Sequence, residues 1–451
     1  MKSRKILFAN FPADGHFSPL TGLAIHLKNS GHDVRWYTGS KYERKIKALG
    51  FTYYPLKKAI DFSTGEPDQV FPERKNQKGL IAKLKFDIRH AFVLRGPEFY
   101  EDIREINGSF PFDIMIADNC FTGIPFVKQL LGKPVIAIGV MPLVETSKDL
   151  PPTGLGLTPS TAFFGKLRQD FMRFFTDKFI FNDSKKLTDK IFSEYGMKTS
   201  KGNVFDIVSK EADLFLQSGT PGFEYDRSDL RDNIHFIGPL LPAGQEKNEN
   251  YQVPDQYNHF KKKILVTQGT VETDVDKIIS PTLEAFRDTE VLVIATTGGS
   301  RTQELRERYP YSNILIEDFI PFDDIMPQVN AYVTNGGYGG VLLGIQNKLP
   351  MVVAGVHEGK NEINARIGYF QLGIDLKTER PSPAQIFESV KTILENPLYR
   401  RNVSKLANEF EDYDPAWLTE KYMDELMSRQ ERSTRATFLR MIRKHAEEKV
   451  Y

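Results

Sequence analysis

The chain has 451 residues, 40% of them hydrophobic and 26% charged, which is enough apolar material for two or three globular domains. Sixty Lys and Arg residues against 59 Asp and Glu leave a formal net charge of +1, so we expect no nucleic-acid partner. The single cysteine, Cys120, excludes an intramolecular disulfide and a cysteine-based structural zinc site, and it fits a reducing compartment.

The N-terminal residues are apolar only from Ile6 to Ala9, which is too short for the core of a signal peptide. The longest apolar stretch, Pro134 to Val144, contains a glycine and a proline and is too short to span a bilayer. We therefore expect a cytoplasmic protein.

Two similar stretches open the two halves of the chain. K-S-R-K-I-L-F-A-N-F stands at the N-terminus and F-K-K-K-I-L-V-T-Q-G begins at Phe260, each with a basic lead-in and a short apolar run. More short apolar runs follow in each half, with helical segments between them. Continuous apolar strands spaced by helices predict an α/β fold with two parallel-sheet domains that face each other across a cleft.

Shifts in composition suggest the domain boundaries. We assign residues 1–240 to the first domain, the polar stretch 241–260 to a linker, 261–415 to the second domain, and 416–451 to C-terminal helices that pack back on the first domain. The end of the chain, R-A-T-F-L-R-M-I-R-K-H, is basic and amphipathic, but a packed terminal helix is favoured over contact with a membrane.

An aromatic segment lies within residues 151–201. Phe164, Leu167, Phe171, Phe174 and Phe175 recur at helical spacing, which predicts a helix with a wide aromatic face. The favoured interpretation is a helix docked on the first domain. The alternative is that its aromatic face lines an apolar ligand pocket.

The sharpest N-terminal signal is the stretch F-P-A-D-G-H-F-S-P-L-T-G-L. Ser18 is predicted to cap a helix with Pro19 at its first position, so that His16 lies on the loop after the first strand. Asp118 ends a later apolar strand at the same carboxyl edge, where it is placed to orient His16 as a general base. A solvated histidine, and an Asp118 that only caps the following helix, are the alternatives.

A glycine-rich turn, V-T-N-G-G-Y-G-G, joins a strand to a helix in the second half. Its amides suit phosphate oxygens, and close strand–helix packing is the alternative. The turn matches neither G-x-G-x-x-G nor a P-loop, which disfavours nicotinamide cofactors and ATP hydrolysis. Q-G-T and T-T-G-G are two more strand-end loops that we expect to face the same ligand. The candidate residues in these three loops are Gly269, Thr270, Thr297, Asn335, Gly336, Gly337, Gly339 and Gly340.

Several motifs occur together in the order and spacing of the family-1 glycosyltransferases: G-H-F-S-P-L, G-H-D-V, the strand that ends at Asp118, F-I-P, V-T-N-G-G, L-P-M-V-V-A and N-A-R. The chain resembles this family from Lys5 to about Asp414, in particular its bacterial members that glycosylate macrolides and other small molecules. The resemblance implies a GT-B architecture, with the acceptor mostly on the first domain and a nucleotide sugar on the second. It also implies inversion at the anomeric carbon, with no metal and no cofactor.

By position, the resemblance implies that His16 is the base and Asp118 its partner. It implies that Phe319 and Ile320 contact the nucleobase. The other donor contacts that it implies are Gly15, Gly269, Thr270, Gly336 and Gly337.

Three places depart from the family pattern. Asn335 replaces the usual histidine, so that a neutral amide would contact the diphosphate, and Leu343 stands where a glutamate usually binds the ribose. Lys360 and Asn361 occupy the place of the acidic residue and glutamine that hold sugar hydroxyls. These departures concern the donor site and leave the predicted base and its partner intact. The residues placed to take over the sugar contacts are Glu358 and Glu362.

We therefore expect an inverting glycosyltransferase that moves glucose from UDP-glucose to a hydroxyl of a phenol, flavonoid, terpenoid or similar lipophilic molecule. Transfer to a membrane lipid, and sugar-nucleotide binding without transfer, are the alternatives. The expected partners are a nucleotide sugar and an apolar small-molecule acceptor, and the chain is expected to be a monomer or a weak dimer.

Overall fold

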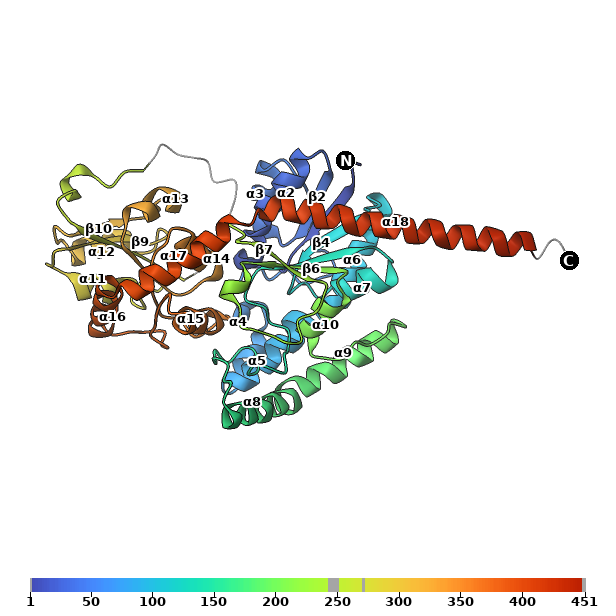
Figure 1. Cartoon of the computed structure of the whole chain (residues 1–451), viewed down its shortest axis with the longest axis horizontal. Helices are drawn as coiled ribbons and strands as arrows, with labels where there is room; N and C mark the ends of the chain where they lie inside the picture. Colours follow the sequence, from blue (N-terminus) through green and yellow to red (C-terminus); the bar gives the residue numbers. More distant parts are fainter. Residues whose placement is uncertain (1, 242–250, 270–271, 448–451) are drawn as a thin grey trace.

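The computed structural model describes residues 2–241, 251–269 and 272–447. Its strands form two parallel sheets that lie side by side, each with helices packed around it (Figure 1). The predicted α/β class with two parallel-sheet domains is confirmed.

The first sheet has seven parallel strands in the order β3-β2-β1-β4-β5-β6-β7. The first three strands are added from β1 toward one edge of the sheet, and β4 to β7 are added toward the other edge. The strand order therefore reverses between β1 and β4, and ligands of open α/β sheets bind at such a reversal. These strands are β1 (Lys5–Ala9), β2 (Asp33–Thr38), β3 (Thr52–Pro55), β4 (Ile114–Asp118), β5 (Val135–Gly139), β6 (Leu214–Ser218) and β7 (Ile234–Gly238).

The second sheet has six parallel strands in the order β10-β9-β8-β11-β12-β13, which repeats the topology of the first six. Its reversal lies between β8 and β11. These strands are β8 (Lys262–Thr267), β9 (Val291–Thr296), β10 (Ile314–Glu317), β11 (Ala331–Thr334), β12 (Met351–Val353) and β13 (Gly373–Asp375).

Each sheet is buried on both faces. In β1, Ile6 and Phe8 join one hydrophobic cluster while Leu7 and Ala9 join another, and all four are fully buried. A strand that is buried on both faces needs apolar side chains at every position, which explains why the strands appear in the sequence as continuous apolar runs.

Helices connect and cover the strands (Figure 1). In the first half they are α1 (Asp14–Phe17), α2 (Leu20–Asn29), α3 (Glu43–Ala48), α4 (Pro67–Val70), α5 (Leu80–Asp87), α6 (Arg95–Ser109), α7 (Ile124–Leu130), α8 (Phe163–Thr176), α9 (Asn182–Glu194) and α10 (Val204–Glu211). In the second half they are α11 (Ile279–Phe286), α12 (Thr302–Arg308), α13 (Phe322–Ile325), α14 (Tyr338–Gln346), α15 (Lys360–Tyr369), α16 (Pro383–Glu395) and α17 (Pro397–Glu411).

The last helix, α18 (Pro415–Glu447), returns from the second half and packs on the first, against α2, β6 and β7 (Figure 1). Met423 and Met427 enter a core cluster there. Glu420 accepts hydrogen bonds from His26 Nε2 at 2.7 Å and from the Ser30 hydroxyl at 3.0 Å. Most side chains of its basic end lie outside the described residues, as do residues 242–250 of the predicted linker.

The aromatic segment forms the predicted helix, α8, and this helix is held to the first half, but not through its aromatic face. Phe164 is 81% exposed and Phe171 66% exposed, so this face does not line an enclosed pocket either. The helix is held by its polar side, because the buried Gln169 side chain accepts a hydrogen bond from Ser160 N and donates one to Asp149 O. Within the described part of the chain, we find no helix with the length and apolar character that crossing a membrane requires.

Candidate active site

The first site lies where β1 and β4 end side by side. Asp118, the last residue of β4, is fully buried. One of its carboxylate oxygens, Oδ2, accepts a hydrogen bond from Phe11 N at 2.6 Å, and the other, Oδ1, accepts one from Cys120 N at 2.8 Å. Two backbone donors thus hold this carboxylate in one orientation, and it does not cap a helix with its side chain.

His16 completes this arrangement. Its Nδ1 lies 2.6 Å from Asp118 Oδ1. Because Asp118 already accepts two amide hydrogens, it acts as a hydrogen-bond acceptor, so Nδ1 carries the proton and Nε2 keeps its lone pair. The His16 side chain is 13% exposed, whereas that of Asp118 is inaccessible. A neutral imidazole oriented by a buried carboxylate can remove a proton from a hydroxyl group.

The prediction that His16 lies on a loop is wrong. It belongs to α1, a single helical turn that ends before Ser18, and the next helix starts at Leu20 without a side-chain cap. The turn forms because Phe17 is 1% exposed and stacks on Tyr42 at a centroid distance of 4.4 Å. This buried ring anchors the turn that carries His16. The neighbouring Gly15 faces open space.

Aromatic rings gather around His16. Phe11 meets the imidazole edge-on at a centroid distance of 5.3 Å and stacks on Phe92 at 4.8 Å. Phe62 packs against Phe11 at 4.9 Å, and Phe205 against Phe92 at 5.1 Å. The sequence reasoning missed these rings because they come from four separate segments without a shared motif. They place flat apolar surface next to the base.

His16, Asp118 and Cys120 also form a group whose potential metal-ligand atoms lie within 4.8 Å of one another. Burial raises the pKa of the Cys120 thiol well above its ordinary value, and the charge of Asp118 acts in the same direction. The thiol therefore stays protonated. Since His16 Nδ1 and both oxygens of Asp118 are already hydrogen-bonded, the group fits a general base better than a metal ligand set.

The second site lies where β11 runs into α14. Gly336 has a φ of +85°, and a Cβ at this position would lie 1.7 Å from Asn364 Oδ1. Only glycine fits such a position. Gly337 precedes the first residue of α14, and a Cβ at Gly339 would have no other atom within 4 Å, whereas Gly340 faces the Tyr332 hydroxyl. A helix end that binds an anion needs open space around its first amides. The space at Gly339 is open in this way.

Asn335 holds two loops together. Its Nδ2 donates a hydrogen bond to the carbonyl oxygen of Gln268, and its Oδ1 accepts one from Gly337 N at 3.3 Å. The side chain is buried. The expectation that this amide contacts the diphosphate is therefore not supported, because its donor and acceptor atoms already join the end of β8 to the start of α14.

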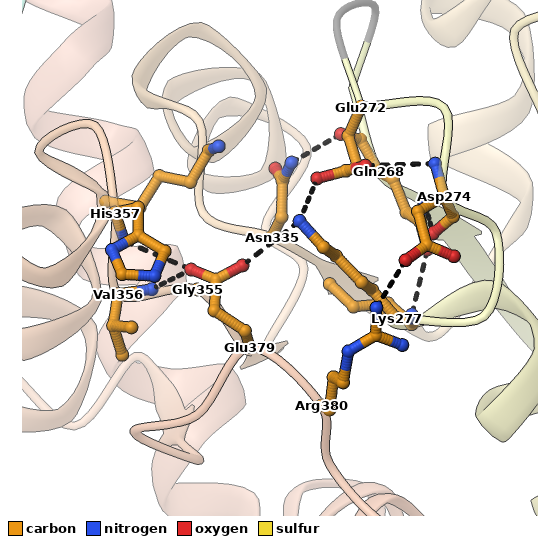
Figure 2. A network of polar contacts seen from close by, with 12 residues as sticks. Gln268, Glu272, Asp274, Lys277, Asn335, Gly355, Val356, His357, Glu379 and Arg380 are labelled. Atoms are coloured by element: carbon orange, nitrogen blue, oxygen red, sulfur yellow. Dashed lines mark hydrogen bonds and ion pairs between the residues drawn. The ribbon is translucent and has the colours of Figure 1, made fainter. Parts of the chain in front are cut away.

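Figure 2 shows a network of charged groups beside Asn335. The amino group of Lys277 lies between the carboxylates of Glu272 and Glu379, 3.7 Å from Glu379 Oε2, and its hydrogen bond to Glu272 raises its pKa. Burial alone would raise the pKa of Glu379, but hydrogen bonds from the amides of Val356 and His357 contribute to a net lowering. The sequence reasoning missed this network because its charged side chains lie on two distant segments, 272–277 and 379–380, and the amides that bind Glu379 lie on a third.

Two other loops reach the same region. Gly269 has a φ of +78°, and a Cβ on it would lie 3.8 Å from Asn335 Nδ2. The Phe319 ring is 73% exposed beside Gly299, which suits stacking on a nucleobase. Thr297 is buried, with its hydroxyl 2.5 Å from that of Thr302, so its side chain supports the loop. Thr270 lies outside the described residues.

Ile320 and Leu343 face the core of the second half, with exposures of 6% and 8%. Because the Ile320 side chain is packed in the core, only its backbone is available to contact a nucleobase. Leu343 offers no hydrogen-bonding group to a ribose.

Asn361 and Glu362 bind the first half of the protein. Glu362 Oε1 accepts hydrogen bonds from Gly154 N at 2.8 Å and Gly156 N at 2.9 Å, and Asn361 Nδ2 donates to Gly154 O at 2.8 Å. The expectation that these two side chains hold sugar hydroxyls is not met in this structure. The start of α15 faces the loop at 154–156, which takes up their polar atoms.

Arg366 strengthens this tie and was missed by the sequence reasoning. It is 2% exposed, and its Nη2 lies 2.9 Å from Glu224 Oε2 of the first half and its Nη1 3.3 Å from Glu362 Oε2. Lys360, at the start of the same helix, pairs with Glu358 at 2.6 Å, so its charge is partly neutralised before any donor binds.

Comparisons with known proteins agree with this fold. Residues 282–419 match the C-terminal domain of erythromycin biosynthesis protein CIII-like proteins. The chain is 31% identical over 406 residues to 4'-demethylrebeccamycin synthase of Lentzea aerocolonigenes, covering 90% of this chain and 95% of the relative. It is 28% identical to UDP-glycosyltransferase 2 of Phaeomoniella chlamydospora, covering 93% and 95%. The calicheamicin glycosyltransferase CalG4 shares the fold, with a TM-score of 0.72, 20% identity, and coverage of 95% and 99%.

Proposed function

The chain belongs to the family-1 glycosyltransferases of the GT-B fold, and we propose that it transfers glucose from UDP-glucose, with inversion, to a hydroxyl of an apolar small molecule. The observation that carries this proposal is the 2.6 Å contact between His16 Nδ1 and the buried Asp118 carboxylate. This pair supplies a base with its free nitrogen lone pair at a partly exposed position.

In the proposed reaction, His16 Nε2 takes the proton of the acceptor hydroxyl. The acceptor oxygen bonds to the anomeric carbon as the bond from that carbon to the diphosphate oxygen breaks, and the electron pair leaves with the diphosphate. Attack on the face opposite the leaving group inverts the anomeric carbon. Asp118 stabilises the imidazolium that forms, because its carboxylate is fixed against Nδ1.

The second half supplies the groups for the donor. In this proposal, the backbone amides of the first turn of α14 stabilise the negative charge that develops on the departing diphosphate. The exposed ring of Phe319 offers a surface on which the nucleobase of the donor can stack. These roles agree with the positions of glycines that leave the backbone accessible.

The acceptor class is supported by the rings of Phe11, Phe62 and Phe92 beside His16. Aromatic side chains favour flat apolar molecules. The names of a 4'-demethylrebeccamycin synthase and a calicheamicin glycosyltransferase among the similar proteins also support a natural-product acceptor.

The test is mass spectrometry of a mixed phenol, flavonoid and terpenoid alcohol panel incubated with UDP-glucose, TDP-glucose or UDP-glucuronate. We expect a product heavier by one hexose with UDP-glucose, and at least about a hundredfold slower formation of that product by the His16→Ala variant on an alcohol. Failure to form a sugar adduct from any donor would contradict the proposal. Transfer from UDP-glucuronate alone would contradict the sugar assignment.

A further inference from the structure

One surface of the first half is unusually apolar. Sixteen large hydrophobic side chains of the described residues are exposed, and ten of them lie on α5 and on the stretch from α8 to residue 179. We call these ten side chains the aromatic face. Its members are Leu80, Ile81, Leu84, Phe163, Phe164, Leu167, Phe171, Phe174, Phe175 and Phe179.

The two helices that carry the aromatic face lie together at one edge of the first half (Figure 1). The π-helical segment Asp177–Phe181 that follows α8 contacts α5, and Lys85 pairs with Asp183 at 3.1 Å. The side of α8 that packs on the protein is polar, with Gln169 and Thr176 buried. The apolar side chains of α8 therefore point outward because this helix is anchored through its polar side.

Positive charge borders the aromatic face. Residues 75–89 contain five basic residues and one acidic residue, and residues 163–186 contain six basic and three acidic, although the whole chain is nearly neutral. Lys166 and Arg168 are exposed on α8 next to the phenylalanines, and Lys178 lies 5.4 Å from the centre of the Phe174 ring. The surface thus combines exposed rings with an excess of cations.

We propose that the aromatic face docks on an anionic lipid bilayer. Helices that lie in a membrane interface combine Phe and Leu on one side with Lys and Arg beside them, and the cations attract acidic head groups. Long basic side chains can reach the head groups while the rings enter the acyl boundary. A second copy of the chain fits less well, because a two-fold contact through this face would bring its basic border against itself.

The aromatic face also leads toward the base. On α5 the exposed Leu84 is followed by Phe86, which packs against Phe71 at a centroid distance of 6.3 Å. Phe71 contacts Phe62 at 6.2 Å, and Phe62 contacts Phe11 beside His16. A lipophilic acceptor dissolved in the bilayer would meet rings along this path. This last step rests on the proposed function, whereas the docking itself does not.

The experiment is flotation of the full-length protein with vesicles of phosphatidylcholine alone or of equal parts phosphatidylcholine and phosphatidylglycerol, at low and high salt. We expect binding to the anionic vesicles that weakens as salt rises. Phe164→Ser/Phe171→Ser should lower the partition coefficient about tenfold or more, and Lys166→Ala/Arg168→Ala should lower it and reduce its salt dependence. The matched control is Trp417→Ser, an exposed aromatic on α18 that should leave binding unchanged.

Each other outcome overturns the docking proposal. It is wrong if the wild type floats with neither vesicle, if it binds neutral vesicles equally well, or if Trp417→Ser reduces binding as much as the phenylalanine variant. It is also wrong if sedimentation velocity shows a dimer that the phenylalanine variant dissociates, since a second copy would then cover the face. Thermal melting should show that the surface variants are folded. Because flotation needs no donor or acceptor, it separates failure of docking from failure of the proposed reaction.

Discussion

The two candidate sites lie at equivalent places in two sheets of the same topology, yet they are built from different groups. At the end of β1 and β4, the site consists of side chains. His16 and Asp118 contact each other, and two backbone amides hold Asp118 in place. At the end of β8 and β11, glycines leave the backbone open, and the Asn335 side chain holds the two loops together. A base needs particular side chains, whereas a diphosphate can be held by amides.

This difference predicts a graded response to mutation. Removing a group that takes part in proton transfer should change the rate of the chemical step most. Removing a glycine at the donor site should act through backbone geometry, and changes far from both sites should affect stability alone.

The largest effect is expected for His16→Ala. It removes the proposed base and should lower kcat on an alcohol acceptor by about 10²–10⁴-fold, the usual contribution of general-base catalysis. Donor affinity should be nearly unchanged, because His16 lies in the first half. Steady-state kinetics and donor titration measure the two quantities separately. A similar loss of donor affinity would show that the two sites are not independent.

Asp118→Asn should have the next largest effect. The amide keeps one acceptor oxygen but replaces the other with an NH₂ group, which is a donor. One of the two backbone donors, Phe11 N or Cys120 N, therefore loses its acceptor. We expect kcat to fall by about 10–10²-fold and the free energy of unfolding to fall by about 1–3 kcal/mol. Kinetics and chemical denaturation measure these changes. A variant with wild-type kcat would remove Asp118 from the positioning of His16.

At the donor site, Gly336→Ala should act through the backbone. The positive φ and the contact with Asn364 Oδ1 make any Cβ unfavourable, so we expect about 1–3 kcal/mol of destabilisation together with a higher KM for the donor. The matched control is Gly339→Ala, where a Cβ meets open space; its stability should stay within about 1 kcal/mol of the wild type. Equal effects of the two substitutions would contradict the assignment of Gly336 as the constrained residue.

Much of this contrast could be predicted from the sequence. The parallel strands followed from continuous apolar runs, and His16 and Asp118 stood out because strand ends at one sheet edge bring distant residues together. Contacts between the two halves could not be predicted in this way. Glu362 and Arg366 come shortly after the two positions where the family holds sugar hydroxyls. In the structure, however, Glu362 binds the loop at 154–156 and Arg366 binds Glu224. The exposed face of α8 was also missed, because periodicity shows that a helix has an apolar side without showing what that side contacts.

Away from both sites, Glu420 ties α18 to the first half. Burial alone would raise its pKa, but hydrogen bonds from His26 and Ser30 outweigh burial and lower it. A lowered pKa in the folded state gives stability that is present above the unfolded-state pKa and is lost as the pH falls through the folded-state value. Glu420→Gln should therefore cost about 1–3 kcal/mol at neutral pH.

The difference between Glu420→Gln and the wild type should narrow as the pH drops below the ordinary glutamate value of 4.5. Thermal melting across this pH range measures it, with Glu425→Gln on the same helix as the control. A stability difference that is independent of pH would show that the charge of Glu420 does not contribute.

The smallest effect concerns the nucleotide. Leu343 is packed in the core and cannot hydrogen-bond a ribose hydroxyl, so the discrimination between UDP-glucose and TDP-glucose should be weak. We expect the two kcat/KM values to agree within about tenfold, or about 1.4 kcal/mol. A preference for UDP-glucose above about a hundredfold would show that another group reads the ribose.

The central claim is that His16, held by Asp118, removes the proton of the acceptor hydroxyl. The most direct test compares wild type and His16→Ala on two acceptors of similar shape, an alcohol and a thiol or phenol that is already ionised at the working pH. We predict that kcat/KM on the alcohol falls by about 10²–10⁴-fold in the variant, while the ionised acceptor loses much less because it needs no base. Near-full activity of His16→Ala on the alcohol, or an equal loss on both acceptors, would contradict the assignment of His16 as the base.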